Sequence, residues 1–314
     1  MSSHALPNPA SAPRWWIYQR ERFPVFNHGA LIAAFSLSAV CYSALLRGST
    51  HFPLPKTIAV AFLSSFLFFL QLRIADEFKD AEEDARYRPY RPVPRGLVTL
   101  RELGIVGGIA AGAQLMLALW LAPGLVLLLS IAWVYLLLMT REFFVSAWLK
   151  RRPVHYLWTH MLILPLIDLY VSACDWFPAG GLPSGLAWLL GLSFLNGVVV
   201  EIGRKLRSPA DEEFGVETYS ALWGRTGAIA VWLAAMALGG YVAAMAGRRV
   251  GFAAFVVAIA VLVFLTAILC AVRFLRHPEP GRGKTIETMS GIWTTLVYAG
   301  CGVVPMLVHA AGAL

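Results

Sequence analysis

The sequence predicts an all-α membrane protein, and three observations support this fold class. Hydrophobic residues make up 58% of the 314 residues and charged residues only 14%, too few charges for the surface of a soluble domain. Uncharged stretches recur along the chain, each close to the ~20 residues that an α-helix needs to cross a bilayer. They are too long and too continuous for barrel strands, the other structure that satisfies its backbone in lipid.

We expect a polytopic protein with nine transmembrane helices after a short tail. Residues 1–27 have no apolar core between basic and small residues, so we interpret them as a cytoplasmic tail with an interfacial Trp15–Trp16 anchor. Residues 28–314 form the predicted intramembrane domain. A hairpin at Ala122-Pro123-Gly124 separates the third span from the fourth. The nine expected spans are 30–46, 57–75, 103–122, 125–140, 155–174, 184–200, 226–247, 250–272 and 288–310.

Basic residues indicate which ends of the spans face the cytoplasm. Of the 26 Lys and Arg residues, 22 lie in the N-terminal tail and in the loops after the second, fourth, sixth and eighth spans. Because basic residues are enriched in cytoplasmic loops, we expect the N-terminus and these loops in the cytoplasm, most simply of a bacterial inner membrane. The formal net charge of +8 is then a consequence of topology and does not indicate nucleic-acid binding.

Acidic residues are concentrated in two windows on the predicted cytoplasmic side. Twelve of the eighteen Asp and Glu residues lie in residues 76–102 and 201–217, which follow the second and the sixth span. One such cluster is typical of a solvated helix end, but two at matching ends of different spans favour a common site.

The first window has the spacing of a metal site. Asp76, Asp80 and Asp84 are four residues apart and fall on one stripe of a helix, with Glu77 beside it. Like charges at this spacing repel one another unless a cation lies against them. Mg²⁺ suits such a stripe, because it binds one or two carboxylates together with substrate phosphates. The alternative is that the acids pair with neighbouring Lys and Arg in solvent.

Basic residues accompany both windows. Three prolines within residues 89–94 predict a stiff loop after the first acids, and this loop carries Arg88, Arg91 and Arg95. The second window begins EIGRKLR, where Glu201 precedes Arg204 and Lys205. Carboxylates for a metal beside cations for phosphate are the composition expected of a diphosphate site.

The fifth span carries ionisable residues within the membrane. Asp168 is the only acidic residue deep in a predicted span, and His160 lies eight residues before it. Such groups are functional candidates, which could contact an acceptor or take a proton, although Asp168 could also hydrogen-bond a neighbouring helix near the outer surface. Asn196 and Gln114 are polar in other spans, where either can serve as an interhelical hydrogen bond.

The acidic pattern resembles a known family. D-E-x-x-D-x-x-x-D at Asp76–Asp84, followed by R-P-x-P-x-G at 91–96, is similar to the first aspartate-rich motif of the UbiA-type intramembrane prenyltransferases. The second family motif is matched in part: Asp211 stands four residues before Gly215, but Arg207 occupies the position of the preceding acid. Glu201 is then the candidate for the missing carboxylate.

This resemblance implies nine helices around a central cavity and a Mg²⁺-dependent reaction. The carboxylates and Mg²⁺ would bind the diphosphate of an isoprenyl donor, which ionises to an allylic cation captured by a small, aromatic acceptor, without a protein partner or nucleic acid. The implied catalytic acids are Asp76, Asp80, Asp84 and Asp211; the implied metal ligands are these four with Glu77 and Glu201; the implied diphosphate ligands are Lys79, Arg91, Lys150, Arg204 and Lys205; the acceptor-pocket candidates are His160 and Asp168.

Two other functions fit the same residues. A membrane terpene cyclase would ionise the same donor and capture the cation with the donor's own double bond. A divalent-cation transporter, from a different class, would use the carboxylates to gather ions, but a continuous acidic path across the membrane is not visible in the sequence.

Overall fold

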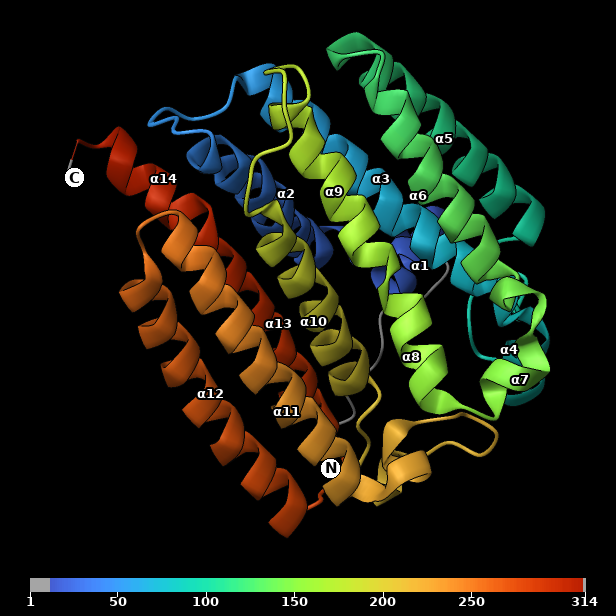
Figure 1. Cartoon of the computed structure of the whole chain (residues 1–314). Coiled ribbons are helices and arrows are strands. Elements are labelled where there is room, and N and C mark those ends of the chain that lie inside the picture. The colour runs from blue at the N-terminus through green and yellow to red at the C-terminus, as the bar shows by residue number, and fades with distance from the viewer. Residues whose placement is uncertain (1–11, 313–314) are drawn as a thin grey trace.

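The computed structural model describes residues 12–312, and this part of the chain contains helices and no strand. Figure 1 shows the long helices running side by side in one inclined bundle. The elements are α1 (Arg14–Arg22), α2 (Val25–Leu46), α3 (Pro55–Lys79), α4 (Ala81–Tyr87), α5 (Leu100–Leu121), α6 (Leu125–Thr140), η1 (Glu142–Phe144), α7 (Ser146–Lys150), α8 (Pro153–Met161), α9 (Ile163–Trp176), α10 (Leu186–Arg204), η2 (Pro209–Asp211), α11 (Tyr219–Arg249), α12 (Ala253–Arg276), α13 (Gly283–Cys301) and α14 (Val303–Ala310).

The predicted count of nine spans agrees with these helices. Eight segments of the described chain are long and apolar enough to cross a membrane, with α8–α9 and α13–α14 each counted as one. The shorter apolar helix α6 is the ninth. All nine predicted spans therefore correspond to helices, which makes this an integral, multi-pass membrane protein.

Prolines explain why two of the spans are broken. Pro165 and Pro305 have no backbone N–H, so the carbonyls four residues earlier, in Met161 and Cys301, lose their helical partner. The two breaks, at Leu162 and Gly302, lie directly after these carbonyls. A Cβ on Gly302 would clash with the backbone oxygen of Ser38, so glycine lets α2 approach this break closely.

The bundle has a central and a peripheral set of helices. Helices α2, α9, α10 and α13 supply most of the fully buried residues, among them Tyr42, Tyr170 and Trp293. Helices α5 and α12 lie at the edges of the bundle (Figure 1) and expose large apolar side chains such as Ile109 and Leu262, as lipid-facing helices do.

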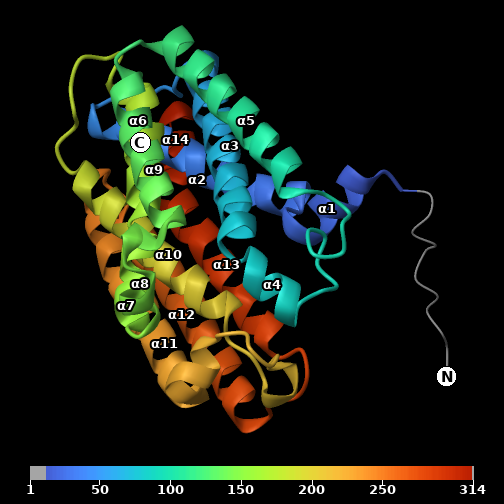
Figure 2. The same cartoon turned by 90° about the vertical axis from the view of Figure 1, so that its right-hand side faces the viewer.

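Helix α1 lies beside the bundle and is attached to it by both apolar and ionic contacts. Figure 2 shows it next to α3 and α5 and separate from the other helices. Tyr18 is buried against Ile74 and Leu103, and Arg14 forms an ion pair with Glu102 at 2.6 Å. Residues 14–22 of the predicted tail are thus packed on the domain, while residues 1–11 of that tail lie outside the described part.

Candidate active site

A cavity of about 480 Å³ opens between the helices at the end of the bundle where α3 and α10 finish. We call this end of the molecule the charged end, because α4, α7 and residues 205–218 gather there with most of the charged cavity residues. Residues from α2, α3, α8, α10 and α13 form the deeper walls, which are mainly apolar and aromatic. The volume lies within the range of about 300–1,000 Å³ typical of small-molecule sites.

Asp76 and Asp80 both line the cavity from the end of α3. Asp76 lies 3.8 Å from the side-chain nitrogens of Arg73 and Lys79, too far for a direct hydrogen bond. Helical backbone bonds continue from Asp80 N to Asp76 O at 2.9 Å and from Asp84 N to Asp80 O at 2.8 Å. Helical hydrogen bonding therefore continues across the change from α3 to α4 at Asp80, but of the three aspartates only Asp76 and Asp80 line the cavity.

Asp80 is set apart by its electrostatic surroundings. Burial raises the pKa of the Asp80 carboxyl, opposed in part by Lys79 and reinforced by Asp76 and Asp84. A carboxyl that is costly to ionise in this environment gains from a nearby cation, because the cation favours its charged form. This is the property expected of a carboxylate that binds a metal ion.

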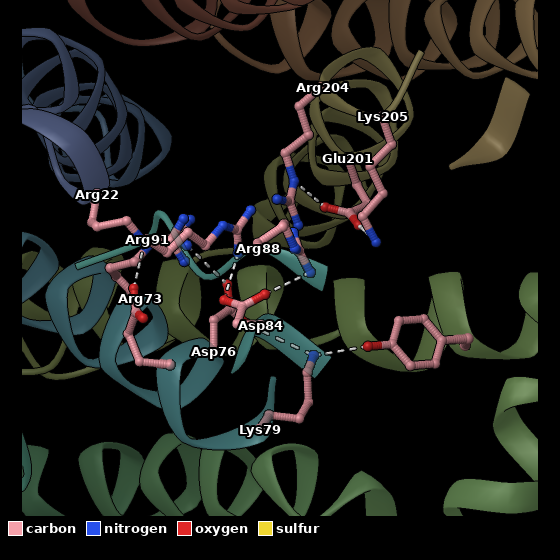
Figure 3. A network of polar contacts seen from close by, with 12 residues as sticks. Arg22, Arg73, Asp76, Lys79, Asp84, Arg88, Arg91, Glu201, Arg204 and Lys205 are labelled. Carbon is pink, nitrogen blue, oxygen red and sulfur yellow. Dashed lines mark hydrogen bonds and ion pairs between the residues drawn. The ribbon is translucent and has the colours of Figure 1, made fainter. Parts of the chain in front are cut away.

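Asp84 is buried and holds two arginines. Its carboxylate oxygens lie 2.7 Å from Arg88 Nη2 and 2.7 Å from Arg91 Nη1. Both arginines line the cavity, whereas Asp84 lies outside the set of lining residues. Figure 3 shows this carboxylate between the two guanidinium groups. Asp84 therefore orients the Arg88 and Arg91 guanidinium groups toward the cavity. Its predicted role as a metal ligand stays a prediction.

Glu77 faces away from the cavity. Its carboxylate is buried and accepts a hydrogen bond from Nε of Arg22 on α1. The cause is the helical turn of about 100° per residue, which directs neighbouring side chains to different sides. Arg22, not Glu77, is a lining residue, and the role of Glu77 as a metal ligand stays a prediction.

The second cluster contributes Glu201 to the same cavity. Glu201 is buried on the last turn of α10, where it pairs with Arg204 and lies 3.0 Å from Lys205 Nζ. These three residues and Arg207 all line the cavity. Asp211 lies elsewhere, on η2, where it accepts a hydrogen bond from the Gly281 backbone nitrogen at 2.8 Å. The structure thus brings Glu201, and not Asp211, to the first cluster.

The donor set suits a metal ion that shares its ligands with a substrate. Within residues 12–312, no three His, Cys, Asp or Glu side chains are grouped closely enough to bind a metal ion by themselves. Asp76, Asp80 and Glu201 nevertheless line one cavity together with nine Lys and Arg side chains. Figure 3 shows Asp76 and Glu201 among several of these cations. Mg²⁺ commonly binds in this way, with one or two carboxylates and the oxygens of a phosphate.

The remaining predicted basic residue, Lys150, and His160 also line the cavity. Lys150 Nζ donates to Glu83 at 2.7 Å, and this hydrogen bond raises the pKa of Lys150. His160 Nδ1 lies 2.8 Å from the backbone oxygen of Tyr156, and its ring stacks on the Tyr156 ring with centroids 3.9 Å apart. Lys79 Nζ donates to the Tyr156 hydroxyl at 2.8 Å, so Tyr156 connects the predicted phosphate ligand to the histidine.

Asp168 occupies a different place from His160. It is fully buried on α9 and lies outside the lining set, and neither carboxylate oxygen has a hydrogen-bond partner in the described chain. The proposed contact of Asp168 with an acceptor therefore stays a prediction.

Several lining residues were not singled out from the sequence. In the sequence, Arg22 and Arg73 look like the other basic residues that mark the cytoplasmic side, and Tyr156 looks like an interfacial aromatic. No local pattern therefore marks these three as lining residues. Glu142 is buried at the cavity wall and starts three consecutive non-glycine residues with positive φ, at 47°, 53° and 60°. Such a turn is strained and persists only where the surrounding structure holds it, but sequence gives no sign of it.

Comparison with known proteins identifies the family of this chain and structures that share its fold. Residues 34–292 match the sequence profile of the UbiA prenyltransferase family. None of the curated proteins matches the chain.

Three solved structures share the fold. A UbiA homologue from Aeropyrum pernix K1 is 16% identical, with a TM-score of 0.68 over 89% of this chain and 98% of its own. A digeranylgeranylglyceryl phosphate synthase is 15% identical, with a TM-score of 0.61 over 96% of this chain and 100% of its own. A UbiA homologue from Archaeoglobus fulgidus, solved with DMAPP and Mg²⁺, is 13% identical, with a TM-score of 0.60 over 94% and 99%.

Proposed function

This chain belongs to the UbiA prenyltransferase family, and from that premise we propose that it ionises an isoprenyl diphosphate with Mg²⁺ and transfers the prenyl group to a small acceptor. One observation carries the proposal. Asp76 on α3 and Asp80 directly after it line the same end of one cavity as Glu201 on α10, which is at least 121 residues further along the chain, among basic residues. The Archaeoglobus fulgidus homologue with DMAPP and Mg²⁺ gives independent support for this ligand pair.

The charged end would hold the diphosphate. Asp76, Asp80 and Glu201 would hold Mg²⁺ there, and the ion would supply positive charge that stabilises the leaving diphosphate. Arg88, Arg91 and Lys205 line this end and can donate hydrogen bonds to the remaining phosphate oxygens. The allylic C–O bond then breaks, and its electron pair stays with the diphosphate.

The deeper part of the cavity would hold the prenyl chain and exclude water. Phe35, Phe69 and Leu72 line it from α2 and α3. Ring centroids of Phe35 and Phe69 lie 5.8 Å apart, and Phe35 also contacts the Tyr298 ring at 5.4 Å. Aromatic faces attract cations, so this wall suits an allylic cation as well as a hydrocarbon chain.

His160 would accept the proton that the acceptor loses. Its Nδ1 lies against a carbonyl oxygen, which can only accept a hydrogen bond, so Nδ1 carries the proton and Nε2 has a lone pair. Nε2 is buried and has no partner elsewhere in residues 12–312. When the acceptor carbon bonds to the cation, the proton released from that carbon passes to Nε2.

Diphosphate release from purified protein tests the proposal. We expect Mg²⁺-dependent release with a donor between dimethylallyl and geranylgeranyl diphosphate, and none with EDTA. Asp80→Asn should lower the rate about a hundredfold or more, the usual loss when a group that stabilises developing charge is removed. Glu82→Gln, an exposed acid of the same cluster, is the matched control and should keep the wild-type rate. Full turnover in Asp80→Asn would contradict the proposal.

Product analysis separates the alternatives. A cyclic hydrocarbon or terpene alcohol as the sole product without an acceptor would identify a terpene cyclase. Flux of Mg²⁺ or Mn²⁺ into proteoliposomes that persists in Asp80→Ala would support a transporter.

A further inference from the structure

One wall of the cavity is polar deep within the bundle. Ser193, Asn196 and Thr294 line the cavity from α10 and α13. Ser193, Asn196 and Glu201 all line the cavity from α10. At a rise of about 1.5 Å per residue, Asn196 lies about 7.5 Å and Ser193 about 12 Å beyond Glu201 along the helix.

Each of these three buried side chains has a polar atom without a hydrogen-bond partner. Their exposed fractions are 0%, 2% and 6%, and Ser193 Oγ, Asn196 Nδ2 and Thr294 Oγ1 find no partner among residues 12–312. The Asn196 amide is fixed in orientation, since its Oδ1 accepts a hydrogen bond from Trp293 Nε1 at 3.1 Å. Buried polar groups are hydrogen-bonded in the great majority of cases, so three exceptions on one cavity wall require an explanation.

Helix packing places the Asp168 carboxyl and the Tyr298 hydroxyl beside this wall, but neither forms a hydrogen bond within 3.5 Å to Ser193 Oγ or Asn196 Nδ2. Gln114, the other polar amide noted within a span, donates to the Ser64 carbonyl and accepts from Trp133 Nε1, each at 3.0 Å. It is a complete interhelical bridge. Buried hydroxyls elsewhere bond back to their own helix, as Ser65 does to Ala61 O at 2.7 Å. The hydroxyls of Ser193 and Thr294 do neither, although such back-bonding is available to any helical Ser or Thr.

We propose that Ser193, Asn196 and Thr294 form a hydrogen-bonding subsite for a neutral hydroxyl group of the acceptor. This subsite rests on the proposed prenyl transfer. Asn196 Nδ2 can only donate, while the two hydroxyls can donate or accept, and a hydroxyl oxygen with its proton satisfies both kinds of partner.

Charge explains why the ligand group is neutral. The Lys and Arg lining residues belong to the charged end, and the nearest of them along α10 is Arg204, beyond Glu201. Asp168 is fully buried on α9, a helix that packs against α10. An acceptor carboxylate placed at Ser193 would lose its hydration without gaining a cation. The subsite therefore selects a hydroxylated molecule with an apolar body.

Equilibrium binding tests the subsite independently of turnover. The probes are hydroquinone and its dimethyl ether, which share one ring but differ in their hydroxyl protons, with 4-hydroxybenzoate as the anionic probe. Binding is measured on full-length protein in lipid nanodiscs, with Mg²⁺ and a non-ionisable thiolodiphosphate analogue of the donor. We expect hydroquinone to bind about tenfold more tightly than the ether or the anion, as two or three hydrogen bonds allow.

Conservative variants give the result that decides. Ser193→Ala and Thr294→Val remove hydroxyls that hold no other residue, and each should weaken hydroquinone binding about three- to tenfold without changing the binding of the ether. The double variant should bind both probes equally. Ser38→Ala removes an equally buried, unpartnered hydroxyl on α2, away from the cavity, and should bind like the wild type.

Each outcome supports or overturns the subsite. It is overturned if wild-type protein binds the probes equally, binds neither, or prefers the anion, or if the variants keep the preference for hydroquinone. Should the double variant fail to fold, the two single variants decide. Mg²⁺-dependent diphosphate release from the donor alone is measured on the same wild-type preparation: its absence contradicts the proposed function, whereas release without probe discrimination contradicts only the subsite.

Discussion

Replacing Asp84 by Asn tests whether this buried carboxylate acts through Arg88 and Arg91. Its side chain is 3% exposed, and those of the two arginines are 13% and 20% exposed, so solvent screens these ion pairs only weakly. Removing one partner of a buried ion pair costs about 3–5 kcal/mol. Because Asn retains one oxygen acceptor, we expect a loss near the lower end, about 3 kcal/mol.

The change should affect the donor and the metal differently. Without the Asp84 carboxylate, the Arg88 and Arg91 side chains are no longer held in one orientation toward the cavity. The KM for the prenyl diphosphate should therefore rise about tenfold, the equivalent of 1.4 kcal/mol. The Mg²⁺ concentration for half-maximal diphosphate release should stay at its wild-type value. Asp80→Asn should show the reverse pattern, with a higher Mg²⁺ requirement.

Two assays on the same preparation decide the matter. Thermal unfolding in lipid nanodiscs reports the loss of stability, and diphosphate release over a grid of donor and Mg²⁺ concentrations reports the two affinities. Exposed Glu82→Gln is the control for a lost charge in the same helix. If Asp84→Asn unfolds like the wild type but needs more Mg²⁺, then Asp84 binds the metal directly and its role through the arginines is refuted.

Three further predictions follow from single residues. Because burial raises the pKa of Asp80, protons should compete with Mg²⁺ there: the half-activating Mg²⁺ concentration should rise as pH falls from 7 to 5, and Asp80→Asn should abolish this dependence. Lys150→Met should cost at most about 1 kcal/mol of stability, since the Lys150–Glu83 pair is half-exposed, yet should raise the donor KM; an unchanged KM would remove Lys150 from the diphosphate site. Gly302→Ala should lower the free energy of unfolding by about 1–3 kcal/mol, because its Cβ would press on Ser38 O, and an unaltered melting temperature would show that α2 can move away.

The sequence was a good guide to the helices and a partial guide to the site. Runs of apolar residues predicted every span, because burial in lipid imposes one length and one composition on each helix. The side on which the acids lie followed from the same topology. The sequence did not show which acids face the cavity. Asp76 and Glu77 are neighbours in the sequence, but Asp76 lines the cavity whereas Glu77 pairs with Arg22 of α1.

The deep polar wall was beyond sequence reasoning for another reason. A single Ser or Thr in a span most often bonds to its own backbone, as Ser65 does. Only the three-dimensional arrangement shows that Ser193 and Thr294 leave this bond unmade. Asn196 showed the same limit. Its Oδ1 bridges helices as predicted, by accepting a hydrogen bond from Trp293, but its Nδ2 has no partner and the residue lines the cavity.

The attachment of α1 determines where the chain can be shortened. Hydropathy places the first span at residue 30, which invites trimming everything before it as a dispensable leader. Such a truncation would remove Arg22 and Phe23 from the cavity lining and leave the Glu77 carboxylate buried without its counter-charge. Tags, fusion partners and protease sites therefore belong before Arg14, and a protein cut at residue 28 would be unsuitable for measuring the activity of this enzyme.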